Sequence, residues 1–388
     1  MFSKRTSWDR QENELSQALE KLRASAKRVF DLTRSNPTEC GFTYVEEKIR
    51  QALGHQGIAE YRPAAQGLAS AREAICGYYR AQHGVKIDDD NVVLASGTSE
   101  AYSFLFRLLC NPGDEVLIPA PGYPLFDFLA DLCDVKLVRF PLVYDHGWQI
   151  DFAALAAAVS ERARAVIVVH PNNPTGHYVR VGEQEKLSEF CRERGMALIA
   201  DEVFLDFSVR DGEPAQSFVY CGKVLTFTLS GLSKICGMPQ MKLAWMALSG
   251  PEAEKREALA RLEVIADAYL SVGTPVQLAV PALLEMRGAF QEQVIARVRR
   301  NLLELDRQLG LQSSCSRMEC QAGWTAVLRV PVLQSDEKLA IALLQERGVI
   351  VHPGHFYDFA REGHLVVSLI VPEAEFAEGI RHLLAHLA

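Results

Sequence analysis

Short apolar runs recur through the first two thirds of the chain, and longer segments with helical periodicity separate them. Within each run consecutive residues are apolar, which is typical of strands that are covered on both faces. Such strands need helices between them, as in a mostly parallel sheet. The predicted strands are residues 91–95, 115–119, 136–140, 165–169, 196–200, 223–227 and 243–247.

The segments between these strands place apolar residues at the spacing of a helix face. Residues 67–79, 100–109 and 183–194 are predicted helices. Gly195 follows the last of them, and glycine readily takes the left-handed conformation that ends a helix. The first 280 residues therefore predict an α/β fold with a mostly parallel sheet between helices.

The pattern changes after about residue 280, where it indicates a smaller α+β domain. A helix over residues 13–30 is expected to pack on this domain. We therefore predict a large domain of residues 51–280 and a small domain made of residues 1–50 and 281–388. The elements expected in the C-terminal part are a long helix through Leu309, a strand over residues 324–330, a helix over 337–346, a strand over 365–371 and a final helix.

Composition and charge exclude several classes of function. The chain has 388 residues, and its formal net charge of −8 provides no broad cationic surface for nucleic acid. The basic start Met1–Arg5 precedes a polar segment where a secretory signal would need apolar residues. No later apolar run is long enough to span a bilayer. We therefore expect neither a nucleic-acid partner nor a membrane association.

The nine cysteines indicate a reducing compartment. They are odd in number and lie between Cys40 and Cys320 without the paired spacing of metal ligands. This pattern is typical of free thiols. We therefore expect a cytoplasmic protein with no metal site.

Two ionisable residues follow predicted strands, at the edge of the sheet where α/β proteins bind ligands. Lys234 lies among small residues in the segment 229–237, where a cofactor can approach the backbone. Asp201 directly follows the run 196–200, so its carboxylate is expected at the rim of the sheet. A lysine in a surface loop and an aspartate that caps a helix are the alternative interpretations.

Three loops after predicted strands carry polar or aromatic side chains. The string His-Pro-Asn-Asn-Pro-Thr-Gly fixes Asn173 as a donor, because prolines restrict the backbone on both sides of it. Another loop leads into a helix, so the amides of Gly97 and Thr98 can face a phosphate. Tyr123 offers a flat ring. An ordinary turn, a plain helix start and a packed tyrosine remain as alternatives.

Together these five segments supply what pyridoxal 5'-phosphate needs. That cofactor requires a lysine for a Schiff base, an acid at the pyridine nitrogen, donors for the phosphate and the phenolic oxygen, and a flat surface over the ring. Candidates for each requirement lie in the segments just described. The sequence therefore predicts pyridoxal 5'-phosphate as the cofactor.

In their order along the chain, these segments resemble the class I and II aminotransferases, which are fold-type I pyridoxal-phosphate enzymes. The resemblance runs from about Tyr61 to the C-terminus. It implies that Lys234 forms the Schiff base, Asp201 pairs with the pyridine nitrogen, Asn173 donates to the phenolic oxygen and Tyr123 stacks on the ring. It also implies contacts on the phosphate side from Ser96, Gly97, Thr98 and Ser233.

The same resemblance implies an assembly and a reaction. Tyr61 matches the tyrosine that reaches the phosphate of the neighbouring subunit, so a homodimer with shared active sites is expected. The expected reaction moves an amino group between an amino acid and a 2-oxo acid by a ping-pong mechanism, in which the freed amine of Lys234 moves the α-proton.

The cofactor side departs from the family pattern at three positions. Phe204 replaces a tyrosine that donates to the phenolic oxygen. We hypothesise that the loss of this hydrogen bond raises the pKa of the Schiff base. Lys242 stands where an arginine holds the phosphate, so the charge is kept without the bidentate fork. Gly231 replaces a serine, and Ser230 is a candidate to compensate.

The substrate side departs at Val366, which stands where the family has the arginine that grips the substrate α-carboxylate. Substitutes for that arginine are not evident from the motif itself. The candidate substrate-binding residues are Arg34 and Asn36, together with His355, His364 and Arg361. Each of these is also consistent with an ordinary solvated side chain.

Two alternative functions stay open. A β-lyase of the C–S lyase type would use the same cofactor but expel a β-substituent, and it would release ammonia without an oxo-acid acceptor. A non-catalytic pyridoxal-phosphate-binding sensor is the other alternative. The sensors of this kind carry an N-terminal winged helix, for which about 60 residues before Tyr61 leave no room.

Overall fold

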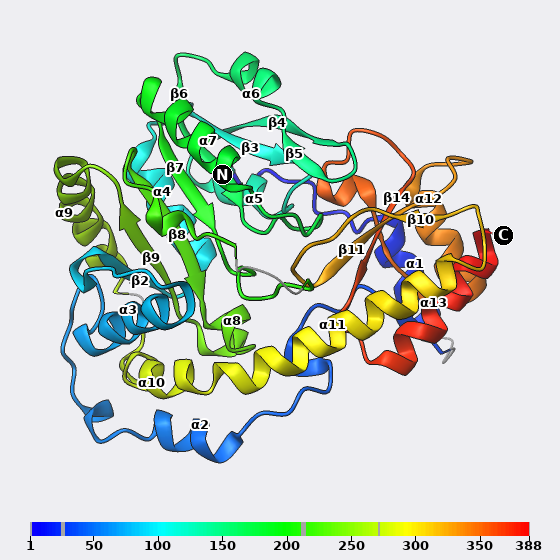
Figure 1. The fold of residues 1–388 in the computed structure, drawn as a ribbon, viewed down its shortest axis with the longest axis horizontal. Helices are drawn as coiled ribbons and strands as arrows, with labels where there is room; N and C mark the ends of the chain where they lie inside the picture. The colour runs from blue at the N-terminus through cyan, green and yellow to red at the C-terminus, as the bar shows by residue number, and fades with distance from the viewer. Residues whose placement is uncertain (1, 25–27, 211–214, 271, 388) are drawn as a thin grey trace.

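The computed structural model describes residues 2–24, 28–210, 215–270 and 272–387. Within these residues the strands form three sheets, of eight, four and two strands. In Figure 1 the eight-stranded sheet lies in the left part of the molecule and the four-stranded sheet lies to its right. Helix α11 (Arg287–Leu309) runs from the first region to the second.

The eight-stranded sheet is mostly parallel, which confirms the predicted α/β class. Its strand order is β2-β9-β8-β7-β6-β3-β4-β5, and only β9 and β5 run against the others. A strand is present in each of the regions predicted for one. The strands are β2 (Val92–Ala95), β3 (Glu115–Ala120), β4 (Lys136–Tyr144), β5 (Trp148–Ile150), β6 (Ala163–Val169), β7 (Ala197–Asp201), β8 (Thr226–Gly231) and β9 (Ala244–Ser249).

Helices cover both faces of this sheet, because both sets of alternating side chains are apolar. In β6, Ile167 packs in one core with α4, α5 and α9, whereas Val166 and Val168 pack in another with α6 and α7. Helices α3 and α10 cover β2 and β9. The bounds are α3 (Ala69–His83), α4 (Thr98–Leu109), α5 (Phe126–Leu132), α6 (Phe152–Ala158), α7 (Val181–Glu193), α8 (Leu232–Ile235), α9 (Glu252–Tyr269) and α10 (Thr274–Glu285).

The C-terminal part builds a smaller α+β arrangement around its own core. The four-stranded sheet is antiparallel, in the order β10-β11-β14-β13, and the two-stranded sheet pairs β1 with β12 in parallel. Side chains of α1, α11, α12 and α13 complete this core. The bounds are α1 (Glu14–Ala24), α12 (Asp336–Ala342), α13 (Glu373–Leu387), β1 (Phe30–Asp31), β10 (Ser316–Arg317), β11 (Thr325–Arg329), β12 (Val349–Ile350), β13 (His352–Pro353) and β14 (His364–Ser368).

The N-terminal helix is shorter than predicted. Helix α1 ends at Ala24, residues 25–27 lie outside the described residues, and Phe30 belongs to β1. The Phe30 N–H donates to the Gly348 carbonyl at 2.7 Å, and its ring is buried in the small core. Pairing with a distant strand therefore overrides the helical periodicity of this segment.

Two predicted strands also end elsewhere. Strand β8 begins at Thr226 and continues to Gly231, and β14 ends at Ser368. Leu369 and Val371 are apolar because they are buried in the core between β14 and α13. An apolar run indicates that its residues are buried. The last residues of the run need not be hydrogen-bonded to a neighbouring strand.

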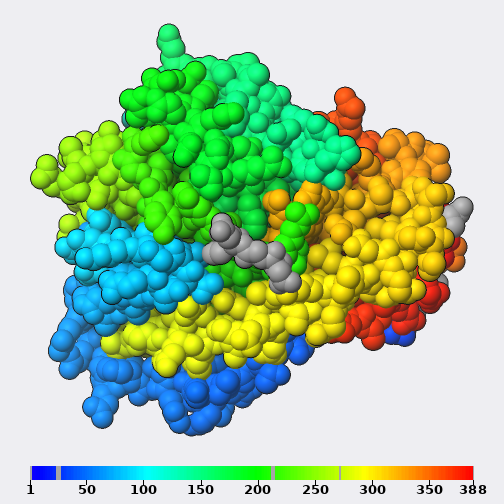
Figure 2. Space-filling view, viewed as in Figure 1, coloured from blue at the N-terminus to red at the C-terminus, as the bar shows by residue number. Residues whose placement is uncertain are grey.

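The N-terminal segment contacts the large sheet's own helices. Trp8 Nε1 donates to Asp131 at 2.7 Å, and its ring packs edge-on against Phe128 of α5. Helix α2 (Glu46–Leu53) packs on α10, and Figure 2 shows this stretch along the lower edge of the molecule. The division of the chain near residues 50 and 280 stays a prediction. None of the described helices is long and apolar enough to cross a membrane.

Candidate active site

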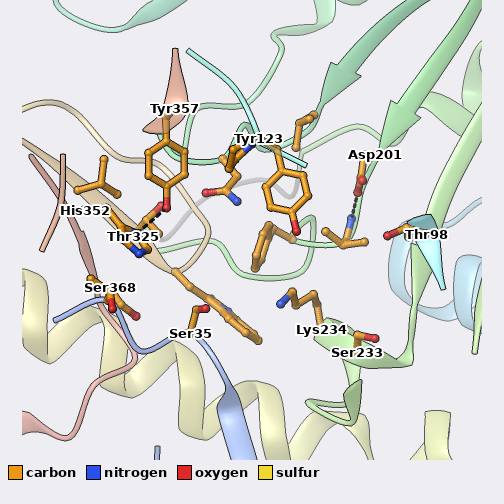
Figure 3. Close-up of a pocket in the computed structure, with 18 of the residues that line it drawn as sticks. Ser35, Thr98, Tyr123, Asp201, Ser233, Lys234, Thr325, His352, Tyr357 and Ser368 are labelled. Carbon is orange, nitrogen blue, oxygen red and sulfur yellow. Dashed lines mark hydrogen bonds between the residues drawn. The ribbon is translucent and has the colours of Figure 1, made fainter. Parts of the chain in front are cut away.

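A cavity of about 300 Å³ lies between the large sheet and the small sheet. The ends of β6, β7 and β8 form one side of it, and residues of β11, β13 and β14 form the other (Figure 3). The carboxyl ends of parallel strands are where open α/β sheets bind ligands. The lining residues are Thr33, Ser35, Thr98, Tyr123, Pro124, Val169, Asn173, Asp201, Val203, Phe204, Gly231, Ser233, Lys234, Ala244, Trp324, Thr325, His352, Tyr357, Val366, Val367 and Ser368.

Lys234 extends its amine into the middle of this cavity (Figure 3). It lies on the short helix α8, directly after β8. Its Nζ is 5.5 Å from the ring centroid of Phe204 and 5.1 Å from that of Trp324. Burial lowers the pKa of Lys234, and the nearby charge of Asp201 opposes this shift. Burial therefore shifts the balance toward the neutral amine, which is the nucleophilic form.

Asp201 ends β7 and is buried at the floor of the cavity. Its carboxylate accepts hydrogen bonds from the Tyr102 hydroxyl at 3.0 Å and from the Val203 N–H at 3.1 Å. Burial raises the pKa of Asp201 to about 6, and the two hydrogen bonds and the charge of Lys234 hold it from rising further. A cation bound beside Asp201 would keep the carboxylate ionised at neutral pH.

Asn173 lines the cavity in the loop after β6. Its Oδ1 is buried and has no hydrogen-bond partner among the described residues. The loop around it is held by a bond from Thr175 Oγ1 to Asn172 Oδ1 at 2.9 Å and by one from Thr325 Oγ1 to the Pro174 carbonyl at 2.8 Å. The loop is thus fixed to the small sheet while the Asn173 amide is left for a ligand.

The end of the cavity near α4 suits an anion. Helix α4 starts at Thr98, so its first N–H groups have no partner within the helix. A Cβ placed on Gly97 would meet no atom within 4 Å, which leaves the backbone open to a ligand. Ser233 lines the cavity, and Ser230 Oγ is buried without a partner among the described residues.

Of the residues predicted for the phosphate side, only Thr98 and Ser233 line the cavity; Gly97 and Ser230 are each next to a lining residue, and Ser96, Lys242 and Tyr61 are also outside the lining. The Ser96 N–H donates to Glu100 Oε2 at 2.6 Å, so this amide is already paired with a side chain of the first turn of α4. Lys242 is exposed, in a left-handed backbone conformation. Tyr61 is 74% exposed and lines a separate pocket beside Leu270 of the same chain. A contact from Tyr61 to the phosphate of a neighbouring subunit stays a prediction.

The predicted substrate-binding residues Arg34, Asn36 and His355 do not line the cavity either. Arg34 forms a two-pronged ion pair with Glu375 on α13, at 2.8 and 3.2 Å. The Asn36 side chain caps a short helical turn by accepting the Thr38 N–H. His355 is exposed. In this structure Arg34 and Asn36 are engaged elsewhere and His355 is exposed, so a substrate-binding role for them stays a prediction.

His364 and Arg361 are also outside the cavity lining. The His364 ring stacks on Phe359, with centroids 4.5 Å apart, and Arg361 is exposed. Neither replaces the missing arginine in this structure.

The small sheet instead presents neutral side chains to the cavity. In the strand register, Thr325 is opposite Ser368 and His352 is opposite Val366, so both pairs share one face of the sheet. His352 Nδ1 is 3.0 Å from the Tyr357 hydroxyl oxygen. The position at which the family carries an arginine therefore has a histidine beside it.

Two departures on the cofactor side have structural explanations. A Cβ on Gly231 would lie 2.9 Å from the Cα and the Cβ of Ala244 and 3.0 Å from the Leu243 carbonyl oxygen. A serine therefore does not fit there unless β9 shifts. Phe204 packs edge-on against Trp324, with centroids 5.2 Å apart, and so belongs to an apolar wall beside Lys234.

Sequence reasoning missed Tyr102, His352 and Tyr357. Tyr102 is four residues after Thr98 on α4, so helical spacing from the anion end was a signal that could have found it. His352 and Tyr357 reach the cavity only through the pairing of β13 with β14. No local pattern gives that register.

The cavity fits pyridoxal 5'-phosphate on the chemistry of its unpaired groups. A lysine amine with a lowered pKa, a buried carboxylate and an anion end built on a helix N-terminus meet in one space. Asn173, which lines the cavity, has an unpartnered Oδ1, and Ser230, next to Gly231 of the lining, has an unpartnered Oγ among the described residues. These are the groups that this cofactor requires, and buried polar atoms of this kind need a ligand to complete them.

Comparison with known proteins identifies the family and the proteins to which this chain is similar. A model of the family "Aminotransferase class I and II" matches residues 27–383. The chain is 26% identical over 378 residues to a glutamate-pyruvate aminotransferase of Haemophilus influenzae, covering 95% of this chain and 93% of that protein. It is 31% identical over 247 residues to an S-alkyl-thiohydroximate lyase of Arabidopsis thaliana, covering 62% and 52%. An alanine aminotransferase structure from Pyrococcus furiosus has a TM-score of 0.91 at 22% identity, covering 100% of this chain and 99% of that one.

Proposed function

The chain belongs to the class I and II aminotransferase family, and we propose that Lys234 and Asp201 carry its chemistry, the transfer of an amino group from an amino acid to a 2-oxo acid. Enzymes of this family depend on pyridoxal 5'-phosphate. The observation that supports the proposal best is the meeting of the Lys234 amine and the Asp201 carboxylate in one cavity with an anion end. Lys234 holds the cofactor as a Schiff base in this proposal.

The bound cofactor supplies an electron sink that stabilises negative charge at the substrate's α-carbon. Lys234 supplies the proton transfer. Because burial lowers the pKa of its amine, the freed Nζ is able to take the proton from the α-carbon and to return it at a neighbouring carbon. Phe204 and Trp324 restrict water around the amine, which keeps its basicity available for this step.

Asp201 sets the charge of the cofactor ring. Its buried carboxylate pairs with the ring nitrogen and keeps that nitrogen protonated. The Tyr102 hydroxyl donates to this carboxylate at 3.0 Å and so fixes its orientation. Asp201 therefore acts through a fixed position as well as through its charge.

The remaining proposed contacts are with the phosphate, the phenolic oxygen and the ring face of the cofactor. Thr98, Gly97 and Ser233 receive the phosphate with the N-terminus of α4, and Ser230 adds a donor. Asn173 donates to the phenolic oxygen, and the Tyr123 ring covers one face. Ser96 and Lys242 contribute at longer range, since Ser96 is separated from Thr98 by Gly97 and the Lys242 side chain is exposed. Tyr61 contacts the phosphate of a second subunit in a homodimer.

The walls favour an amino acid with a small apolar side chain. Trp324, Phe204 and Val366 are apolar where the substrate must lie, and Lys234 is the only lysine or arginine among the described residues that line the cavity. The relatives named glutamate-pyruvate and alanine aminotransferase agree with this. The cytoplasm is the proposed compartment, because all nine cysteines are free in the structure.

An absorbance spectrum with added cofactor tests the assignment of Lys234. Wild type is expected to show the visible band of a lysine-linked cofactor, and Lys234→Ala is expected to lack it. A panel of amino acids, beginning with alanine, should bleach the band, and a 2-oxo acid should restore it. A band of equal strength in Lys234→Ala would contradict the assignment.

A second candidate, β-elimination, is favoured by the similarity to the Arabidopsis lyase. The same experiment separates the two. Stoichiometric bleaching that persists until an oxo acid is added supports transamination. Ammonia release from a cysteine conjugate without an oxo acid, with the band recovering by itself, supports the lyase.

A further inference from the structure

The two ends of the cavity differ in charge. At the large-sheet end are Asp201, Lys234 and the N-terminus of α4, and at the small-sheet end are His352, Tyr357, Ser368 and Thr325 (Figure 3). An amino acid bound to the first end must extend its carboxylate away from Asp201. The small-sheet end is the space that remains for it.

Taking a carboxylate out of water costs several kcal/mol unless a cation or several donors replace the water. The described residues at the small-sheet end include no lysine or arginine. His352 is the one residue there whose side chain is able to gain a positive charge near neutral pH.

The position of His352 suits this task. It lies on the edge strand β13, opposite Val366, and its ring borders the cavity. Its Nδ1 is engaged by the Tyr357 hydroxyl at 3.0 Å. If Tyr357 donates to Nδ1, the hydrogen of the neutral ring is on Nε2. Burial raises the pKa of Tyr357 strongly, so its hydroxyl stays protonated; its oxygen accepts from Nδ1–H once the ring is an imidazolium, because both ring nitrogens then donate.

Two further donors at this end are unused. Ser368 Oγ and Trp324 Nε1 are buried and have no hydrogen-bond partner among the described residues. Both residues line the cavity with His352. Thr325 differs, because its hydroxyl already donates to the Pro174 carbonyl. Both atoms are covered in this structure, so a carboxylate at this end would accept from them once the side chains turn toward it; native interiors rarely leave such donors unsatisfied.

We propose that His352 binds the substrate carboxylate as an imidazolium, with Tyr357 fixing its ring and Ser368 and Trp324 donating alongside it. This inference rests on the proposed function, because it assumes that the amino donor or its oxo-acid product carries a carboxylate. His352 then takes the place of the arginine that the family carries at position 366.

Binding by His352 has a consequence that binding by arginine lacks, namely the uptake of a proton. Burial lowers the pKa of His352 in the ligand-free protein, with Asp31 opposing the shift, so the ring enters the complex neutral at pH 7. A bound carboxylate raises the pKa of His352. Carboxylate affinity should therefore fall as pH rises between the ligand-free and the ligand-bound pKa, and level off on either side.

Other titratable groups surround His352 and need to be separated from it. Tyr357 follows it in the chain, Asp31 acts on it from β1, and Lys234 is in the same cavity. Asp336 on α12 accepts the N–H groups of Gly363 and His364 of the neighbouring strand. Asp201 also lines the cavity, and burial raises its pKa to about 6 in the ligand-free protein. The absorbance band of the Lys234 linkage reports the protonation of that linkage directly.

Calorimetry of the holoenzyme with butyrate tests the proposal without turnover. Butyrate carries the carboxylate and lacks an amino group, and butyramide is its neutral counterpart. In buffers of different ionisation enthalpy, wild type is expected to take up close to one proton per butyrate near pH 7, after the change in the Lys234 band is subtracted, and none per butyramide. The proposal would be overturned if the measured proton uptake were fully accounted for by the change in protonation of the Lys234 linkage.

Variants decide whether the proton is on His352. In His352→Gln, butyrate should bind roughly 10- to 100-fold more weakly at pH 6, with the proton uptake lost and butyramide affinity kept within about twofold. In His352→Arg, butyrate should bind without proton uptake. His146→Asn, an exposed turn residue, is the matched control and should behave as wild type. Equal weakening of butyrate and butyramide in His352→Gln would indicate a merely structural role and would refute the proposal.

Failure of this inference differs from failure of the proposed function. If amino acids still bleach the cofactor band in wild type and in His352→Gln with equal apparent affinity, the aminotransferase stands and the carboxylate is bound elsewhere. If only amines that lack a carboxylate bleach the band, the carboxylate proposal falls together with the amino-acid substrate. Both outcomes are read from the same pair of proteins.

Discussion

At the scale of single residues, the charge on Asp201 depends on what surrounds one carboxylate. Burial raises the pKa of Asp201 to about 6, against the hydrogen bonds from Val203 and Tyr102. The Tyr102 hydroxyl is itself buried, and burial together with the charge of Asp201 raises its pKa, so it stays a donor. Tyr102 is therefore a positioning residue for the acid.

Tyr102→Phe should raise the pKa of Asp201 by about one to two units, because a hydrogen bond to a charged group contributes roughly 1.5–3 kcal/mol. Cofactor binding needs the ionised carboxylate, so the acid limb of its pH profile should move to higher pH. Titration of the apoprotein with cofactor at several pH values measures this. Tyr79→Phe removes another buried tyrosine hydroxyl, one that accepts from Trp245, and should leave the profile in place.

Phe204 allows a test in the opposite direction, since a hydrogen bond is added. Phe204→Tyr should lower the pKa of the cofactor linkage at Lys234 by about one unit, because the new hydroxyl stabilises the phenolate. A spectroscopic titration of wild type and variant gives both values. An unchanged pKa would mean that the hydroxyl does not reach the phenolic oxygen from this position, where the ring packs on Trp324.

Residues with a local signal were the ones that could be predicted. Lys234, Asp201 and Asn173 each follow a predicted strand, and all three line the cavity. His352 could not be found in this way, because its place depends on the register between β13 and β14. His355 was a candidate instead, three residues along the chain, and it is exposed. The pattern of apolar and polar residues predicts a strand, but it does not predict which other strand pairs with it or in which register.

At the scale of elements, the pairing of β8 with β9 determines how closely the chain passes Lys234. Gly231 is opposite Ala244 in this antiparallel pair, and a Cβ on Gly231 would approach Ala244 to 2.9 Å. Both residues line the cavity. The glycine thus sets the approach of the two strands just before α8 begins.

Gly231→Ser should lower the free energy of unfolding by about 1–3 kcal/mol, the usual cost of overpacking. The double variant with Ala244→Gly should recover part of this loss, because the clash with the Ala244 methyl group is removed while the close approach to the backbone at position 244 remains. Urea denaturation of the single and double variants measures the difference. Equal stability of Gly231→Ser and wild type would show that β9 moves aside freely.

Elements were predicted better than their ends for a related reason. The buried strands of the large sheet are apolar on both faces, so each is visible as a run. The segment 13–30 carries one helical pattern, yet Phe30 leaves it to pair with Val349 of β12. Long-range pairing of this kind leaves no trace in the local pattern.

At the scale of the whole molecule, distant parts of the chain meet around one cavity. Thr33 and Ser35 from the N-terminal part, Lys234 from the middle and Ser368 from the C-terminal part all line it. Strand β1 pairs with β12, and the Ser368 N–H of β14 donates to the Leu32 carbonyl at 2.6 Å, which ties the N-terminal part to the small sheet. The sequence predicted the α/β part and the smaller α+β part. It did not predict which residues of the two parts meet around the cavity, because that depends on how the whole chain folds.

The exposure of Tyr61 leads to a test of the proposed homodimer. Tyr61 is 74% exposed in a single chain and lies outside the lining of its cavity, whereas a second subunit would place it at a phosphate. Tyr61→Ala and Lys234→Ala should each impair activity in their own dimers. When the two are unfolded together and refolded, hybrid dimers contain one site with both native residues, so activity should recover to roughly a quarter of wild type. Two chains that both carry Lys234→Ala serve as the control, since no pairing of them restores a lysine. If the mixture shows no more activity than the separate variants, Tyr61 serves its own chain, and the separation between Tyr61 and the cavity in this structure would then require a rearrangement within one subunit.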